Sequence, residues 1–82
     1  MTKAAQPPDP ALAAALRRLR EERSMSREAL AYHAGITVAS LARIELGQAN
    51  PSWATVRSVA RALAISLAEL AVEVEAQDSP TP

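Results

Sequence analysis

The sequence predicts an all-α protein built from five short helices. Its length of 82 residues favours one domain. The chain is rich in the helix formers Ala, Leu, Glu and Arg and holds two Gly. With two aromatic residues, Tyr32 and Trp53, a core can form only between helices packed closely through small side chains. The predicted helix starts are marked by five N-cap signals: Asp9, Ser26, Thr37, Ser52 and Ser66.

The first two predicted helices end at local breaks in the chain. Pro10 is tolerated at the first position of helix one, which runs to about residue 23, where Ser24-Met25 interrupts it. Helix two runs from the Ser26 cap to about residue 34, and Gly35 ends it as expected of a left-handed position. The apolar faces are Leu12, Leu16 and Leu19 in the first helix and Leu30 and Ala34 in the second.

Helices three and four flank a turn. Helix three is predicted from the Thr37 cap to about residue 46, before Gly47. After the extended or turn signal Asn50-Pro51, Ser52 opens helix four. The core faces are Leu41 and Ile44 in helix three and Val56, Val59 and Leu63 in helix four.

Helix five has two overlapping start signals. Ser66 and Glu69 have the spacing of a capping box, and Ile65 and Leu70 that of a hydrophobic staple. The helix is predicted to run to about residue 76. Polar, proline-containing segments flank the whole set, so residues 1–8 are expected to be a disordered arm, 77–82 a disordered tail and 9–76 the folded domain.

The residue inventory excludes several kinds of chemistry. Without Cys the chain has no disulfide, thiolate catalyst or Cys-ligated zinc, and one His cannot build a His-rich metal site. Since no carboxylate pair marks an evident cleft either, we expect no enzyme and no cofactor or metal. No separate effector domain is evident, so a small-molecule ligand is not implied. No apolar run approaches the roughly 18 residues that span a membrane, and no signal peptide follows Met1. We therefore expect a cytoplasmic protein.

Charge is distributed unevenly although the net charge is +0. Residues 17–61 carry eight Arg and four Glu, a net of +4, and residues 62–82 carry a net of −4. A basic body with an acidic end is compatible with a nucleic-acid partner. An ordinary protein with mixed surface charge would show the same distribution.

Helices two and three are joined by only three residues, Gly35-Ile36-Thr37. A connection this short brings two helices into contact at a steep angle, as in a helix-turn-helix. Ala31 lies at the expected crossing, where a larger side chain would push the helices apart. Gly35 supplies the turn geometry without steric cost.

Together these features resemble the Cro/repressor-type, or XRE-like, helix-turn-helix family. The resemblance covers roughly residues 11–70. It is carried by LRRLREER (16–23), SREALA (26–31), AGI (34–36), LARIE (41–45), Gly47, NPS (50–52) and the stretch from ARAL to Leu70 (60–70). It implies a compact, lambda-repressor-like five-helix bundle that binds double-stranded DNA, usually as a two-fold homodimer on a palindromic operator.

Three positions depart from the family pattern. Arg27 stands where many members carry a Gln that contacts the DNA backbone. Val38 and Ala39 occupy the start of the recognition helix, where polar base readers are frequent. Trp53 replaces a smaller aliphatic residue and is expected to cover the core at the start of helix four.

Groove recognition assigns roles to the exposed residues around helix three, because a helix fits the major groove with its first residues at the base edges. Val38 and Ala39 offer apolar contact to thymine methyls, and Arg43 a bidentate pair with guanine. Alternatively, the first two are plain surface residues and Arg43 pairs with a neighbouring Glu. Residues at helix starts and in the loop after helix three are placed for phosphates. The candidate DNA contacts are Arg27, Thr37, Val38, Ala39, Ala42, Arg43, Gln48 and Asn50.

Two further groups have structural roles. In the resembled family, positions matching Arg20 and Glu45 form an ion pair between helices one and three; if buried, such a pair fixes geometry more surely than it adds stability. The last helix carries an apolar stripe predicted to form the dimer interface, with the alternative that the stripe completes the monomer core. The stripe consists of Leu67, Leu70, Ala71 and Val74.

Three functions fit the sequence. The first is a transcriptional regulator, most often a repressor. The second is the antitoxin of a toxin–antitoxin pair, with a protein partner bound through the C-terminal helix. The third is a protein-interaction adaptor that has kept the fold and lost DNA binding, which the neutral net charge and the apolar start of helix three favour.

Overall fold

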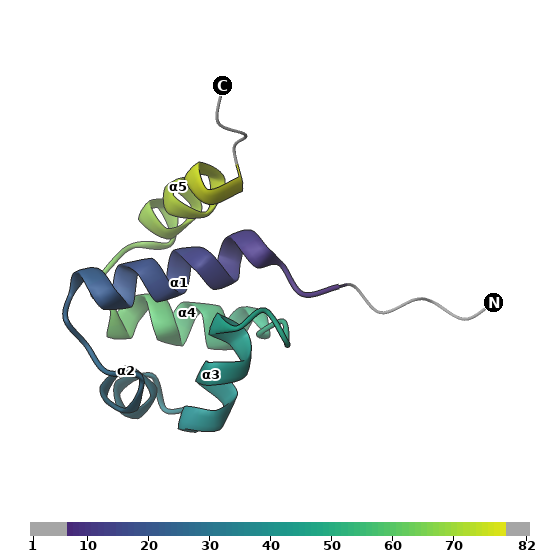
Figure 1. Cartoon of the computed structure of the whole chain (residues 1–82). Coiled ribbons are helices and arrows are strands. Elements are labelled where there is room, and N and C mark those ends of the chain that lie inside the picture. The colour runs from purple at the N-terminus through teal and green to yellow at the C-terminus, as the bar shows by residue number, and fades with distance from the viewer. Residues whose placement is uncertain (1–6, 79–82) are drawn as a thin grey trace.

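A computed structural model describes residues 7–78 of the chain. These residues form five α-helices and no strand: α1 (Pro10–Glu22), α2 (Arg27–Ala34), α3 (Val38–Glu45), α4 (Trp53–Ala62) and α5 (Leu67–Asp78). Figure 1 shows α2 and α3 below α1 and α4, and α5 above them. The predicted all-α class is therefore confirmed. Within the part described, each helix is too short or too polar to cross a membrane.

The predicted N-caps all form, and each satisfies backbone donors that a helix start leaves without partners. The Asp9 carboxylate accepts from the amides of the second and third residues that follow it. The hydroxyls of Ser26, Thr37, Ser52 and Ser66 each accept from the amide three residues on. The Ser66 amide also donates to Glu69 Oε1 at 2.8 Å. These two bonds complete the capping box, and the hydrogen bond from the Ser66 amide lowers the pKa of the Glu69 carboxyl.

Four residues at the helix ends adopt left-handed backbone conformations. Gly35 (φ 73°) and Gly47 (φ 72°) follow α2 and α3, as the sequence predicts. Ser24 (φ 53°) and Ala64 (φ 59°) do the same after α1 and α4. A side chain with a Cβ costs roughly 1–2 kcal/mol in this region, whereas glycine adopts it freely. Ser24 and Ala64 are therefore strained positions.

Replacing Ala64 with glycine is expected to raise the free energy of unfolding by about 1 kcal/mol, because the left-handed strain is relieved. Thermal melts of the wild type and of Ala64→Gly test this. The matched control is Ala14→Gly in the interior of α1, which should instead lower stability by about 0.5–1 kcal/mol. Destabilisation of both variants would contradict the assignment of strain at Ala64.

The core lies between the helices and is filled mainly by leucine, valine and alanine. Leu16, Leu30, Leu41 and Leu63 are fully enclosed, and alanines of α1 are buried beside them. Ala31 is also fully buried, as expected for a residue at the crossing of α2 and α3. The low aromatic content is thus accommodated by close approach of the helices.

Two predicted boundaries shift in the structure. The helix α5 ends at Asp78, two residues beyond the expected end, and Gln77 Nε2 donates to Glu73 Oε2 at 3.0 Å one turn earlier. At the other end, the carbonyl of Pro7 is held by the Asn50 side chain, so the last residues of the expected arm contact the domain. The remainder of the predicted arm and tail, residues 1–6 and 79–82, lies outside the described residues.

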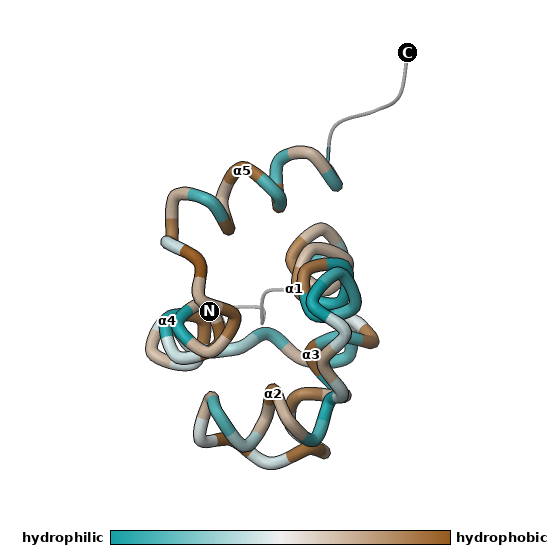
Figure 2. Tube along the Cα trace, turned by 90° about the vertical axis from the view of Figure 1, so that its left-hand side faces the viewer, coloured by the Kyte–Doolittle hydropathy of each residue, from teal (hydrophilic) through white to brown (hydrophobic). Residues whose placement is uncertain are grey.

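The helix α5 packs mainly on α1, and Arg18 Nη1 pairs with Glu73 Oε1 at 2.8 Å across this contact. Figure 2 shows α5 lying over α1 and α4, on the side opposite α2. The starts of α1 and α4 are left less covered, and Trp53 is 65% exposed there. The expectation that Trp53 covers the core was wrong, because its position at the first residue of α4 leaves its ring outside the contacts between helices.

Candidate nucleic-acid interface

The three-residue connection between α2 and α3 has the geometry predicted for a helix-turn-helix. Gly35 ends α2 in the left-handed conformation, and the Ile36 amide then donates back to the Ala31 carbonyl at 3.0 Å. This bond closes the end of α2 and turns the chain toward the Thr37 cap of α3. Because Ala31 presents only a methyl group, α3 packs directly against α2.

The helix α3 presents two distinct faces. Leu41, Ile44 and Glu45 are buried against the rest of the domain. The residues predicted to face DNA lie on the other side: Thr37, Val38, Ala39 and Arg43 are exposed and Ala42 is half-buried. These five members of the predicted set are thus brought together on one outward face, at the N-terminal end and along one side of the helix.

The side chain of Arg43 has no hydrogen bond or ion pair within residues 7–78. The alternative in which it pairs with a neighbouring Glu is therefore not seen there. Its guanidinium remains available on the same face as Val38 and Ala39.

The loop after α3 holds two further candidates, Gln48 and Asn50. Gln48 is exposed. Asn50 is also exposed, and its side chain is engaged within the protein: its Oδ1 accepts from the Asp9 amide at 2.9 Å, and its Nδ2 donates to the Pro7 carbonyl at 2.8 Å. Asn50 thus joins the loop to the residues before α1, and its contact with DNA stays a prediction.

Arg20 and Glu45 are in contact, and the contact is bidentate. Arg20 Nε and Nη2 donate to the two carboxylate oxygens at 2.8 and 3.0 Å, and Nη1 donates to the Met25 carbonyl at 2.8 Å. The Glu45 side chain is fully enclosed. Its hydrogen bonds raise the pKa of the Arg20 guanidinium. Through Arg20, this ion pair therefore ties α1 to the end of α3 and to the turn before α2.

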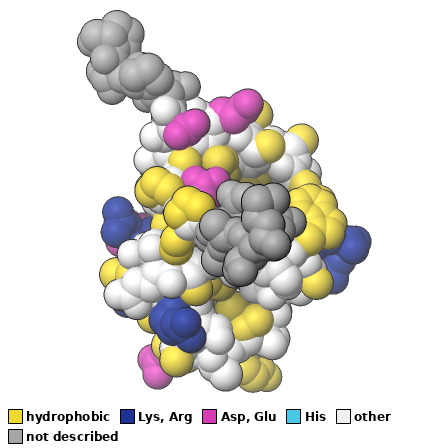
Figure 3. Space-filling view, turned by 90° about the vertical axis from the view of Figure 1, so that its right-hand side faces the viewer, with side chains coloured by type: hydrophobic (Ala, Val, Ile, Leu, Met, Phe, Trp, Pro, Cys, Tyr) yellow, Lys and Arg dark blue, Asp and Glu magenta, His cyan; other side chains and the backbone are white. Residues whose placement is uncertain are grey.

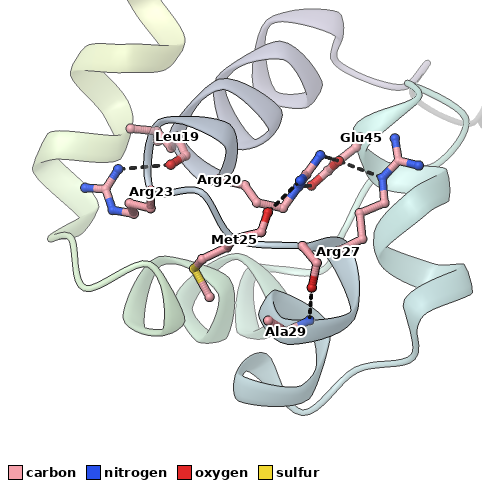
Figure 4. A network of polar contacts seen from close by, with 8 residues as sticks. Leu19, Arg20, Arg23, Met25, Arg27, Ala29 and Glu45 are labelled. Carbon is pink, nitrogen blue, oxygen red and sulfur yellow. Dashed lines mark hydrogen bonds and ion pairs between the residues drawn. The ribbon is translucent and has the colours of Figure 1, made fainter.

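Arg27 bonds to the same carboxylate, a contact that the sequence does not indicate. Its Nε donates to Glu45 Oε1 at 2.9 Å, and its side chain is 34% exposed. Figure 4 shows Arg20 and Arg27 approaching Glu45 from two sides. Eighteen positions separate Arg27 from Glu45 and no periodicity links them, so only the fold reveals this contact.

Arg23 is a second arginine with a structural role that the sequence did not indicate. Its Nε donates to the Leu63 carbonyl at 2.9 Å and its Nη1 to the Leu19 carbonyl at 3.0 Å. The side chain thus satisfies carbonyl groups at the ends of α4 and α1, a recognised use of arginine near helix C-termini.

Comparison with known proteins places the chain by both sequence and structure. A family model described as a helix-turn-helix domain matches residues 11–72. No curated protein matches the chain.

Several solved structures share the fold. The clp gene regulator ClgR from Corynebacterium glutamicum is 29% identical, with a TM-score of 0.79 over 83% of this chain and 72% of that one. The restriction-modification controller protein C.AhdI from Aeromonas hydrophila is 33% identical, with a TM-score of 0.72 over 74% of this chain and 92% of that one. The controller protein C.Esp1396I, 17% identical with a TM-score of 0.80, shares the fold. The chain belongs to the helix-turn-helix family of DNA-binding transcriptional regulators, in its XRE-like, Cro/repressor-type form.

Proposed function

We propose that this protein is a sequence-specific regulator of transcription, a repressor that binds a palindromic operator as a homodimer. The observation that carries the proposal is the outward face of α3, where the Arg43 side chain, beside Val38 and Ala39, has no partner among residues 7–78, while the inner face is packed into the core. A helix presented in this way fits the major groove.

Each exposed residue has a role that follows from its chemistry. Val38 and Ala39 offer apolar contacts to thymine methyl groups, and Arg43 offers two parallel donors to guanine O6 and N7. Thr37 and Gln48 flank the helix and are placed for backbone phosphates, which set the register without reading sequence. Arg27 contributes a phosphate contact through the side of its guanidinium that does not face Glu45.

Selection of bound sequences from a random duplex pool, followed by binding measurements at increasing salt, tests this function. We expect one enriched palindromic motif and an affinity that falls steeply with salt, because phosphate contacts release counterions. An absence of any enriched motif together with undetectable binding at low salt would instead support the adaptor function.

Replacing Arg43 with alanine is expected to weaken binding to the selected operator by about 1–3 kcal/mol and to relax the preference at one guanine per half-site. The comparison is made on the operator and on the same duplex with that guanine replaced. An equal loss on both duplexes would assign Arg43 to a phosphate instead.

The homodimer is proposed through an apolar groove of about 370 Å³ between the start of α1, the start of α4 and α5. Its lining includes the predicted stripe of α5, which consists of Leu67, Leu70, Ala71 and Val74. The other helices contribute Leu12, Trp53 and Val56. Figure 3 views the molecule from the end where α1 and α4 begin and shows hydrophobic side chains spread over it. A dimer is needed because a single module of this size buries too little DNA surface for tight specific binding.

One member of the stripe needs a correction. Leu70 is only 4% exposed and belongs to the monomer core, because α5 turns it toward α1 and α4. The free surface is made by Ala71, which is exposed, and by the half-buried Leu67 and Val74. For Leu70, this burial favours the alternative in which the stripe completes the monomer core.

Replacing Val74 with aspartate is expected to shift the protein from dimer to monomer at tens of micromolar, because a charge would be buried in the interface. Sedimentation equilibrium measures the change. The matched control is Val72→Asp, on the exposed flank of the same helix, which should leave the dimer intact. A wild type that stays monomeric both free and on DNA would rule out this interface.

A further inference from the structure

The guanidinium of Arg27 is divided between two environments. Its inner edge, through Nε, is bonded to a carboxylate that is fully enclosed. Its two outer nitrogens have no partner within the part of the chain that the structure describes. Figure 4 shows these outer nitrogens directed away from Glu45. The bond to Glu45 therefore orients the Arg27 side chain, and the two outer nitrogens stay available as donors.

Arg20 shows the contrast on the same carboxylate. All three of its guanidinium nitrogens are used, two on Glu45 and one on the Met25 carbonyl, and its side chain is 11% exposed. Arg20 is complete as a structural residue. Arg27 has one bond where Arg20 has three, and it stands at the first position of α2, where the first helix of a helix-turn-helix meets the DNA backbone.

We propose that Glu45 is a positioning residue for DNA binding, and that it acts by holding Arg27 so that the outer edge of its guanidinium faces a backbone phosphate. The inference rests on the proposed function. Glu45 itself is enclosed and touches no DNA. Its carboxylate holds the inner edge of the planar Arg27 guanidinium, and because the guanidinium is rigid, the direction of its outer edge is then fixed as well.

The planar shape of arginine is required for this arrangement. An arginine presents donors on two edges at once, so it serves Glu45 and a phosphate together. A lysine carries one compact ammonium. While the ammonium stays on the enclosed carboxylate, it stands where Nε stands now, short of the outer nitrogens and of the phosphate. The Arg27→Lys substitution thus keeps the positive charge and removes the second donor edge, so it distinguishes the effect of charge from the effect of shape.

The test compares the wild type with Arg27→Lys and Arg27→Met on a mixed-sequence duplex three helical turns long, over a series of salt concentrations. We expect both variants to lose about 0.9 of the log–log salt slope for each protomer bound, which weakens binding about eightfold per contact at 0.1 M salt. Thermal melts should show Arg27→Lys close to the wild type, because the ion pair is kept. Arg61→Lys and Arg61→Met, on exposed Arg61 next to the start of α5, are the matched controls and should keep the wild-type slope.

Three results would overturn the proposal. If Arg27→Lys keeps the wild-type slope and affinity, a positive charge alone suffices and Glu45 positions nothing. If Arg27→Met keeps the wild-type slope, Arg27 only supports the fold. If the wild-type protein binds no duplex at low salt, the proposed function fails together with this inference, whereas the first two results leave that function standing.

Discussion

Replacing Glu45 with alanine is expected to lower the free energy of unfolding by about 3–5 kcal/mol, the usual loss when one partner of a buried ion pair is removed. The reason is that two arginines share this one carboxylate. Without it, Arg20 is left charged at a site where its side chain is 11% exposed. Because small domains are stable by only about 5–15 kcal/mol, the variant should melt far below the wild type.

Thermal and urea unfolding measure the loss, and Glu22→Ala is the control. Glu22 also forms ion pairs, with Arg18 and Arg23, but its side chain is 51% exposed. Such pairs contribute about 0–1 kcal/mol. A double-mutant cycle with Arg20→Met then isolates the pair, and we expect a coupling above about 0.5 kcal/mol. Additive effects would mean that the two side chains stabilise the protein independently.

Replacing Leu41 with alanine is expected to cost about 2–5 kcal/mol, because the substitution leaves a cavity in a closely packed core. Leu41 is fully enclosed on the inner face of α3. Binding should suffer as well as stability, since Leu41 holds α3, the proposed DNA-reading helix, against the domain. We expect the loss of operator affinity at room temperature to exceed what the unfolded fraction alone explains.

The control for this prediction is Leu46→Ala. Leu46 caps the same helix but is 54% exposed, so its truncation should change stability by less than about 0.5 kcal/mol. The two variants are compared by chemical denaturation, with the same dependence of the unfolding free energy on denaturant concentration assumed for both. A similar loss at both positions would show that α3 is held by its end and not by its inner face.

The local features of this fold are readable from the sequence. Each N-cap bond spans two or three residues, so a Ser, Thr or Asp before an apolar repeat is enough to place a helix start. The turn at Gly35 is equally local, because a left-handed residue after α2 has a strong residue preference. These short-range signals fixed the helices, and the short connection at Gly35 identified the helix-turn-helix.

Contacts between distant segments were not readable in the same way. The bond from Arg27 to Glu45 and the bonds of Asn50 to residues before α1 depend on how complete helices pack. Apolar periodicity predicted that Leu70 faces inward or toward a partner, but not which of the two. Where the family resemblance supplied a pair, as for Arg20 and Glu45, the long-range contact was found; where this chain departs from the family, as at Arg27, it was missed.

The exposure of Trp53 gives the protein a built-in optical reporter. It is the only tryptophan in the chain, and it stands at the edge of the apolar groove with 65% of its surface in solvent. An indole in water emits at long wavelength both before and after unfolding, so intrinsic fluorescence should respond weakly to denaturation. A blue shift would instead signal that another surface has covered the ring. The emission spectrum therefore follows assembly on this face, while loss of the helices must be followed by circular dichroism.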